Sequence, residues 1–239
     1  MKVIILAAGV GSRLRPLTDN TPKSLLSVAG KKILERNIEN LQALGINSVC
    51  IVTGYLEEVI QSFVQERFPT LSVEYIRNER YSETNTGYSL LLTKDYVAGD
   101  EFIKFDADVV FEKAILEKLL QSTNSALCID TNINLEAEEV KVTTDESGNV
   151  LSVGKKLDPH TANGESIGIE KIAKDAGDKL FEILSDLMQH DEHLQDYYDD
   201  SYTTLVEAGF PFEAVDITGL KWVEIDNHQD YERANSIFA

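Results

Sequence analysis

The sequence has few cysteines, few histidines and no long apolar run. Its two cysteines, Cys50 and Cys128, lie inside apolar segments without metal-binding or redox spacing, so we expect buried thiols and a reducing, cytoplasmic compartment. The four histidines form no zinc or nucleophilic constellation, which removes the hydrolase and metalloprotease classes. The opening apolar run ends after about seven residues, well under the ~20 of a membrane span, and predicts a buried strand.

Positive charge is also scarce. The chain has 22 Lys and Arg against 41 Asp and Glu, and the net charge of -19 argues against a nucleic-acid polymer or an anionic membrane as partner. Residues 1–32 are the exception, because they hold six of the cations and one acid. A basic segment on an acidic protein predicts a site for a small polyanion; the alternative is a solvated loop.

Strands and helices alternate over about the first 130 residues. This order implies βαβ units and a Rossmann-like, mostly parallel sheet flanked by helices, in the α/β class. Buried strands are predicted at 2–7, 47–54, 71–76, 101–107 and 125–129, and helices at 33–44, 59–64, 87–98 and 113–122.

The pattern changes after residue 130. Period-two alternation around a turn at Gly148 predicts an antiparallel hairpin over 138–157, which makes a small antiparallel insertion in a single domain, 1–239. Residues 186–200 carry six acids and no Lys or Arg, and we expect a solvated, mobile face there. The remaining predicted elements are strands at 165–172, 212–217 and 220–226, a helix at 176–188, and a last helix from the cap Asn227 to near Phe238.

A glycine-rich segment, AAGVGSRLRPLTDNTPKSLL, follows the first strand. Glycine lets the backbone approach a phosphate or a base closely. The segment fits neither the dinucleotide fingerprint, because Leu14 replaces its third glycine, nor the P-loop, which needs Gly-Lys-Ser/Thr. Arg13 and Lys23 can instead converge on one polyphosphate, and the prolines between them stiffen the loop.

The longer stretch ILAAGVGSRLRPLTDNTPKSLLSVAGKKIL resembles the signature of nucleotidyltransferases that join an NTP to a phosphorylated sugar or alcohol and release pyrophosphate. Within them the chain is most similar to the cytidylyltransferases for phosphocholine or inositol 1-phosphate. TNTGYSLLLTK, FDADVVF, SVGKKL and WVEIDNHQDYERA follow in the family's order, so the resemblance spans nearly the whole chain.

This resemblance implies a GT-A-like nucleotidyltransferase fold, with a nucleotide-binding part over about 1–130 and an acceptor-binding part over about 131–226. It implies CTP and a small phosphorylated alcohol as substrates and Mg²⁺ as cofactor. A homodimer is left open.

The resemblance also assigns residues at the nucleotide end. Arg13 would hold the β- and γ-phosphates, and Lys23 the α-phosphate in the transition state. Asp108 and Asp226 would form the metal pair, with Asp106 in support and Glu224 as a further candidate. The nucleotide would contact Leu6, Ala7, Ala8, Gly9, Gly11, Asn85, Thr86, Gly87 and Asp106.

The acceptor is less clearly encoded. Lys155 matches the family's acceptor-phosphate lysine, although a shift of one residue would exchange it with Lys156. Choline would need an aromatic and acidic pocket, whereas inositol would need hydroxyl-binding Asp, Glu and Asn. Phosphocholine, inositol 1-phosphate, an aminoalkylphosphonate and a sugar phosphate all stay open. The acceptor-binding candidates are Lys155, Lys141, Glu165, Tyr88 and Trp222.

Two other functions are alternatives to cytidylyl transfer. A sugar-1-phosphate nucleotidyltransferase would use UTP, dTTP or GTP, but the chain is short for that group and carries EIDN in place of its usual ending. A nucleotide-binding regulatory subunit without catalysis would be expected to lack Lys23 or the acidic pair, and the sequence retains all three.

Overall fold

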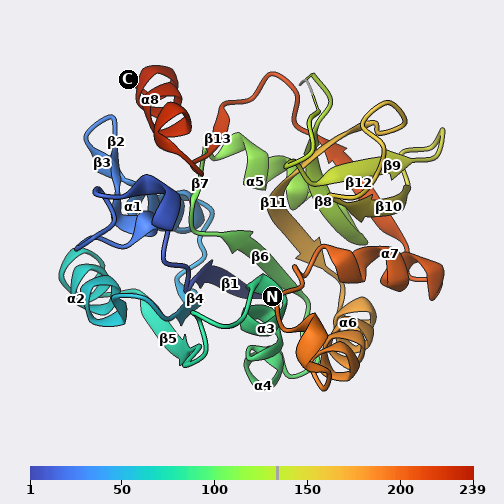
Figure 1. Cartoon of the computed structure of the whole chain (residues 1–239), viewed down its shortest axis with the longest axis horizontal. Helices are drawn as coiled ribbons and strands as arrows, with labels where there is room; N and C mark the ends of the chain where they lie inside the picture. The colour runs from blue at the N-terminus through green and yellow to red at the C-terminus, as the bar shows by residue number, and fades with distance from the viewer. Residues whose placement is uncertain (133–134) are drawn as a thin grey trace.

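A large mixed sheet forms the centre of the computed structural model, which describes residues 1–132 and 135–239 (Figure 1). Strand β8 (Ser125–Asp130) pairs with β11 and with β12 (Phe212–Asp216) beside the main strand order. Along that order the strands are β10 (Val150–Gly154), β9 (Lys141–Thr144), β11 (Gly164–Ile172), β6 (Phe102–Asp106), β1 (Lys2–Ala7), β4 (Ser48–Thr53) and β5 (Ser72–Arg77).

Two small sheets and the helices surround the main sheet. One small sheet pairs β2 (Ser27–Val28) with β3 (Lys31–Lys32), and the other pairs β7 (Val109–Phe111) with β13 (Trp222–Glu224). Figure 1 shows α1 and α2 near β4 and β5, and α6 and α7 at the opposite end. The helices are α1 (Ile33–Ala43), α2 (Glu57–Arg67), α3 (Thr86–Leu91), α4 (Lys94–Val97), α5 (Ala114–Leu119), α6 (Lys174–Leu187), α7 (Asp200–Glu207) and α8 (His228–Ile237).

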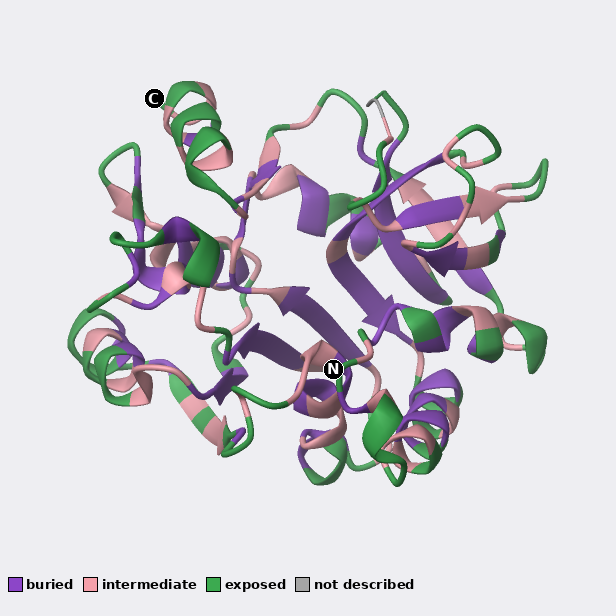
Figure 2. Cartoon of the chain, viewed as in Figure 1, coloured by how far each residue is buried: buried purple, intermediate pink, exposed green. Residues whose placement is uncertain are grey.

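Strand β1 shows why the sheet is buried on both faces. Val3 and Ile5 belong to the apolar core on one face, while Ile4 and Leu6 belong to the core on the other. Side chains alternate across a strand, so a continuous apolar run fits only a strand that is covered on both sides. Each such side chain contributes ~1.5–3 kcal/mol of burial free energy. The central strands are accordingly buried in Figure 2.

The pairing confirms the α/β class. Strand β1 pairs in parallel with β4 and β6, and β4 pairs in parallel with β5. The predicted hairpin is present as the antiparallel pair of β9 and β10. None of the helices among the described residues is both long enough and apolar enough to span a bilayer.

Two local predictions were wrong. The helix predicted over 87–98 is divided into α3 and α4, and the Thr93 hydroxyl donates to the Leu90 carbonyl at 2.7 Å beside the break. A hydroxyl that takes a helix carbonyl in this way competes with the regular hydrogen-bond ladder.

Residues 186–200 are not a simple solvated face either. Leu194 and Tyr198 are buried, with 6% and 2% of their surface exposed. Together with Tyr202 they recur every fourth residue, which is the spacing of an apolar stripe. The many acids around them make this spacing hard to recognise in the sequence.

Gly168 marks an irregularity that shapes the sheet near the cavity described below. The register of β11 against β8 shifts between Ser166 and Glu170, and Gly168 has a φ of 71°. A Cβ at this position would lie 2.8 Å from Oδ2 of Asp106. Only glycine avoids both the left-handed strain and this contact.

We therefore expect Gly168→Ala to lower the free energy of unfolding by about 3 kcal/mol, from backbone strain plus overpacking. Gly148→Ala is the matched control, because Gly148 has a φ of 82° and open space around a Cβ, and should cost only about 1 kcal/mol. Urea unfolding of both variants measures the difference. Equal losses of unfolding free energy in the two variants would show that the Asp106 side chain moves away from a Cβ at residue 168 without cost.

Candidate active site

An open cavity of about 770 Å³ lies where the parallel strands end. Leu6, Ala8 and Gly9 line it at the end of β1, and Asp106 and Asp108 line it at the end of β6. In parallel sheets the carboxyl ends of neighbouring strands meet at one edge, which is where ligands of α/β proteins bind. The cavity therefore lies at the edge of the sheet where a ligand is expected.

Lys23 is the central cation of this cavity. Its Nζ donates to Oδ2 of Asp108 at 2.7 Å and to Oδ1 of Asp226 at 2.8 Å. Arg13 approaches the same Asp226 with Nη2, 2.7 Å from Oδ2. Burial alone would lower the pKa of Lys23, but the two carboxylates outweigh it and raise the pKa above its ordinary value. The ammonium group therefore stays charged at neutral pH.

Three carboxyl groups converge beside Lys23. Oxygen atoms of Asp108, Glu224 and Asp226 lie within 4.8 Å of one another. The backbone brings them together, because Glu224 of β13 is paired with Val109 of β7 and the Ile225 N–H donates to the Asp108 carbonyl at 3.2 Å. An all-carboxylate donor set fits a hard cation such as Mg²⁺.

Crowding of these acids shifts their protonation. Burial raises the pKa of Glu224 well above its ordinary value, and the charges of Asp108 and Asp226 raise it further. Burial also acts to raise the pKa of Asp226, but Lys23 and Arg13 outweigh it and lower the pKa. These shifts in pKa favour the ionised form of Asp226 and disfavour ionisation of the neighbouring Glu224.

Asp106 lies apart from this cluster. Strand β6 ends at Asp106, so the two acids of FDAD do not continue along one strand face. Its Oδ2 accepts a hydrogen bond of 2.5 Å from the Tyr198 hydroxyl and lies 3.6 Å from Nζ of Lys104. Asp106 thus connects the end of β6 to the segment 186–200.

The remaining nucleotide candidates divide between the cavity and the core. Asn85 caps α3 by accepting from the Thr86 N–H at 2.8 Å. Ala7 packs in the core on one sheet face, and a Cβ on Gly87 would lie 2.9 Å from the Asp196 carbonyl, so Gly87 allows segment 186–200 to approach α3. The candidates that line the cavity are Leu6, Ala8, Gly9, Gly11, Asn85, Thr86 and Asp106.

The acceptor candidates divide in the same way. Lys155, Glu165 and Trp222 line the cavity, and Nζ of Lys155 lies 4.5 Å from the ring centroid of Tyr197. Lys141 is fully buried, and its Nζ donates to the carbonyls of residues 136, 137 and 139, so it holds that loop instead of facing the cavity. Tyr88 stacks under the Arg80 guanidinium, 5.7 Å from ring centroid to Cζ.

Several cavity residues escaped the sequence prediction. Tyr197, Tyr198 and Asp199 reach the cavity from the segment 186–200, where the spacing of Leu194, Tyr198 and Tyr202 was the missed signal. Asn227, Asp230 and Arg233 also line the cavity and lie within the motif WVEIDNHQDYERA, although no binding role was assigned to them there. Other lining residues have no local signature, among them Asn78, Glu136, Glu138 and Glu139.

The fold and the site together define a class of protein: an α/β enzyme whose cations and carboxylates suit transfer of a phosphorus group from a polyphosphate. The chain belongs to the nucleotidyl transferase family, whose model matches residues 2–239. It is accordingly a nucleotidyltransferase.

Curated relatives are similar along the whole chain. The choline-phosphate cytidylyltransferase of Streptococcus pneumoniae is 29% identical over 99% of this chain and 98% of its own length. The bifunctional IPC transferase and DIPP synthase of Aquifex aeolicus is 32% identical over 97% of this chain, which spans 50% of that protein.

A solved structure supports the same grouping. The CTP:phosphocholine cytidylyltransferase from Streptococcus pneumoniae superposes with a TM-score of 0.83 at 27% identity, covering 100% of this chain and 99% of that one. The fold is therefore the GT-A-like fold of this enzyme group.

The pH dependence of stability tests the burial of Glu165. Burial, together with the charge of Glu139, raises the pKa of Glu165 from 4.5 to about 7. The folded chain then binds more protons than the unfolded chain between these values, so stability is lost as the pH rises. Glu165→Gln carries no such proton, and the stability of the natural chain should fall relative to this variant by about 2–3 kcal/mol from pH 4 to pH 8.

Urea unfolding across that pH range measures this difference. The exposed Glu207→Gln is the control and should leave the pH dependence unchanged. Parallel curves for the natural chain and Glu165→Gln would contradict the shifted pKa.

Proposed function

We propose that this enzyme transfers CMP from CTP to a small phosphorylated alcohol with a cationic head group, such as phosphocholine, and releases pyrophosphate. The observation that carries the proposal is the convergence of Lys23, Asp108 and Asp226 in one cavity. Similarity to a choline-phosphate cytidylyltransferase along the full length of both chains supports the choice of CTP.

The reaction needs no nucleophile from the protein. An oxygen of the acceptor phosphate attacks the α-phosphorus of CTP and forms the new P–O bond. The bond to the bridging oxygen breaks, and pyrophosphate leaves with its electron pair. Lys23 and Arg13 stabilise the negative charge on the α-phosphate and on the leaving group. At ~4 Å and an effective dielectric constant near 20, each cation contributes about 4 kcal/mol of attraction to a unit charge.

Asp108 and Asp226 would hold Mg²⁺, with Glu224 beside them. When bound, the ion neutralises phosphate charge. Lys23 and Arg13 supply positive charge to Asp108 and Asp226. Binding of metal and nucleotide would therefore exchange partners: the phosphates would take the two cations and the metal would take the carboxylates.

The two ends of the cavity suit different ligands. We infer that the nucleotide lies along the β1 end and its glycine loop, with Asn85 and Thr86 near the base. The acceptor would lie at the other end, with its phosphate at Lys155. Carboxylates beside aromatic rings are the surroundings that a cationic head group prefers. The cavity residues that would provide them are Glu136, Glu138, Glu139, Glu165, Asp199, Tyr197, Tyr198 and Trp222.

Pyrophosphate release with Mg²⁺ tests the proposal over a grid of four NTPs against phosphocholine, phosphoethanolamine, 2-aminoethylphosphonate, inositol 1-phosphate and glucose 1-phosphate. We expect turnover with CTP and an acceptor that carries a positive charge. Turnover with inositol 1-phosphate would keep cytidylyl transfer but reject the cationic head group. Turnover only with a sugar phosphate and an NTP other than CTP would reject both cytidylyl transfer and the cationic head group.

Lys23→Ala separates catalysis from metal binding. We expect turnover to fall by about 10²–10³, because a cation at the α-phosphate is lost. Mn²⁺ without nucleotide should bind about tenfold more tightly than to the natural chain, because Nζ no longer occupies the carboxylate oxygens. CTP should therefore increase the Mn²⁺ affinity of Lys23→Ala by a smaller factor than it increases that of the natural chain.

Electron paramagnetic resonance of free Mn²⁺ measures this affinity independently of turnover. Lys31→Ala is the control, because Lys31 pairs with Glu39 away from the cavity. Unchanged turnover in Lys23→Ala would overturn its catalytic role, and unchanged Mn²⁺ affinity would overturn the exchange of partners.

A further inference from the structure

Asp130 is a buried carboxylate at the end of β8, with 9% of its surface exposed. Its Oδ2 accepts a hydrogen bond of 2.8 Å from Nε1 of Trp222. Its Oδ1 accepts from the Asn132 N–H at 3.0 Å and from the Thr218 hydroxyl at 3.2 Å. The carboxylate is therefore fixed through both oxygens and in turn fixes the indole.

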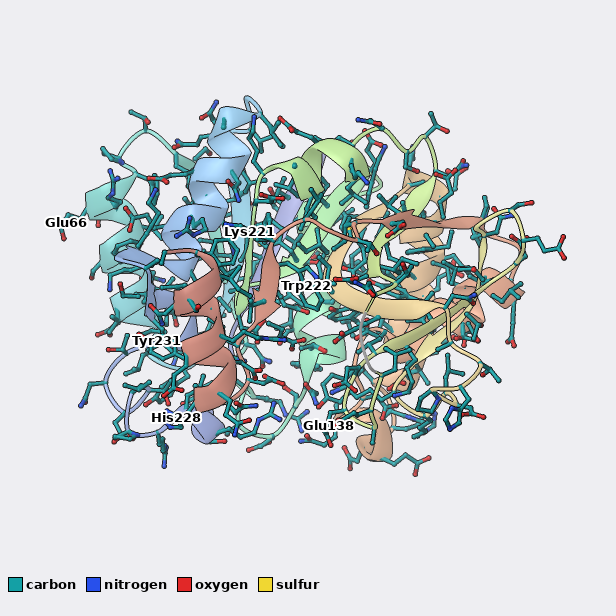
Figure 3. The ribbon with its side chains drawn as sticks, turned by 90° about the horizontal axis from the view of Figure 1, so that it is seen from above. Glu66, Glu138, Lys221, Trp222, His228 and Tyr231 are labelled. Atoms are coloured by element: carbon teal, nitrogen blue, oxygen red, sulfur yellow. The ribbon has the colours of Figure 1, made fainter. Side chains whose placement is uncertain are left out.

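The indole belongs to the wall of the cavity. Trp222 begins β13, where it pairs with Phe111 of β7, and it lines the cavity. The same strand ends at Glu224, and Asp226 of the carboxylate cluster follows two residues later. Figure 3 shows Trp222 near the middle of the molecule, between helix α8 and the strands β9 to β11. Trp222 thus lies on the strand that leads from the acceptor end to the metal candidates.

Asp130 also sets the position of a neighbouring carboxyl group. The antiparallel pairing of β8 and β11 places Glu165 directly opposite Asp130. Glu165 lines the cavity and is itself buried. Strand pairing with Asp130 therefore fixes the backbone position of Glu165, while the Asp130 side chain fixes the orientation of the Trp222 indole. The face of an aromatic ring attracts ammonium groups.

We propose that Asp130 is a positioning residue that determines acceptor specificity by holding the Trp222 ring against the cationic head group. The inference rests on the proposed function. A cation must lie within about 6 Å of the ring centroid for the attraction to matter. An indole whose N–H is bound keeps one orientation, whereas a released indole rotates about its side-chain bonds and loses that contact.

The chain carries its own reporter for this contact. Trp222 is the one tryptophan among the 239 residues, so intrinsic tryptophan emission reports on this ring alone. Release of the ring should shift the emission maximum and shorten the anisotropy decay. A change that affected stability alone would leave both signals as they are in the folded chain.

Asp130→Ala should raise KM for the acceptor about tenfold while kcat changes less than about threefold, because uniform binding is lost. KM for CTP should stay unchanged. Phosphocholine and phosphoethanolamine are the probes, and their effect on Trp222 emission in the presence of CTP without metal should be lost in this variant. Asp130→Asn keeps an oxygen that can accept from the indole N–H, and should behave more like the natural chain.

Thr218→Ala is the matched control. It removes the hydrogen bond to Oδ1 of Asp130 and leaves the bond to Trp222 untouched. If Asp130 only stabilised the end of β8, Thr218→Ala would reproduce the KM and emission changes, and the proposal would be overturned. Unchanged emission and KM in Asp130→Ala would overturn it as well.

The wild-type chain separates this inference from the proposed function. Pyrophosphate release with either probe, without any effect of that probe on Trp222 emission, would reject the inference and leave cytidylyl transfer standing. Absence of both signals with both probes would reject the cationic acceptor and the inference together.

Discussion

The charge balance around Lys23 is the constraint on which the site depends. An acidic chain brings Asp108, Glu224 and Asp226 together, and these groups repel one another unless a cation lies among them. Lys23 supplies that cation with 14% of its side chain exposed. Removing one partner would leave the remaining charges of this partly buried cluster unbalanced, so the cavity is held in shape by the same groups that would meet the substrate.

The sheet then determines which residues reach the cavity. Strand β11 pairs with β6, β8 and β9, and its shifted register at Gly168 lets one strand serve all three. This arrangement joins Asp108, which follows β6, to Glu165 and to Asp130. Tyr198 adds a second connection, because its hydroxyl bonds Asp106 from the segment 186–200. Strand pairing and this hydrogen bond thus connect different parts of the cavity wall.

Local pattern predicted most of the elements but misjudged the helix over 87–98 and the segment 186–200. The run Lys2–Ala7 and the stripe of Ile33, Leu34, Ile38 and Leu41 predicted a strand and a helix that the structure confirms, because side-chain periodicity follows directly from backbone geometry. For residues 186–200 a solvated face was predicted from their six acidic side chains. Leu194 and Tyr198 decide their packing, since a buried aromatic ring outweighs solvated charges around it.

The sequence by itself determined the chemical inventory: a glycine loop, two cations beside it, and carboxylates at two strand ends. Only the tertiary structure decided which of them meet. Lys23 donates to Asp226, which lies 203 positions away in the sequence. Asp106 instead accepts from Tyr198, and Lys141 donates to backbone carbonyls. Residue type and spacing are local properties. Convergence depends on strand order and register, which arise from the packing of the whole chain.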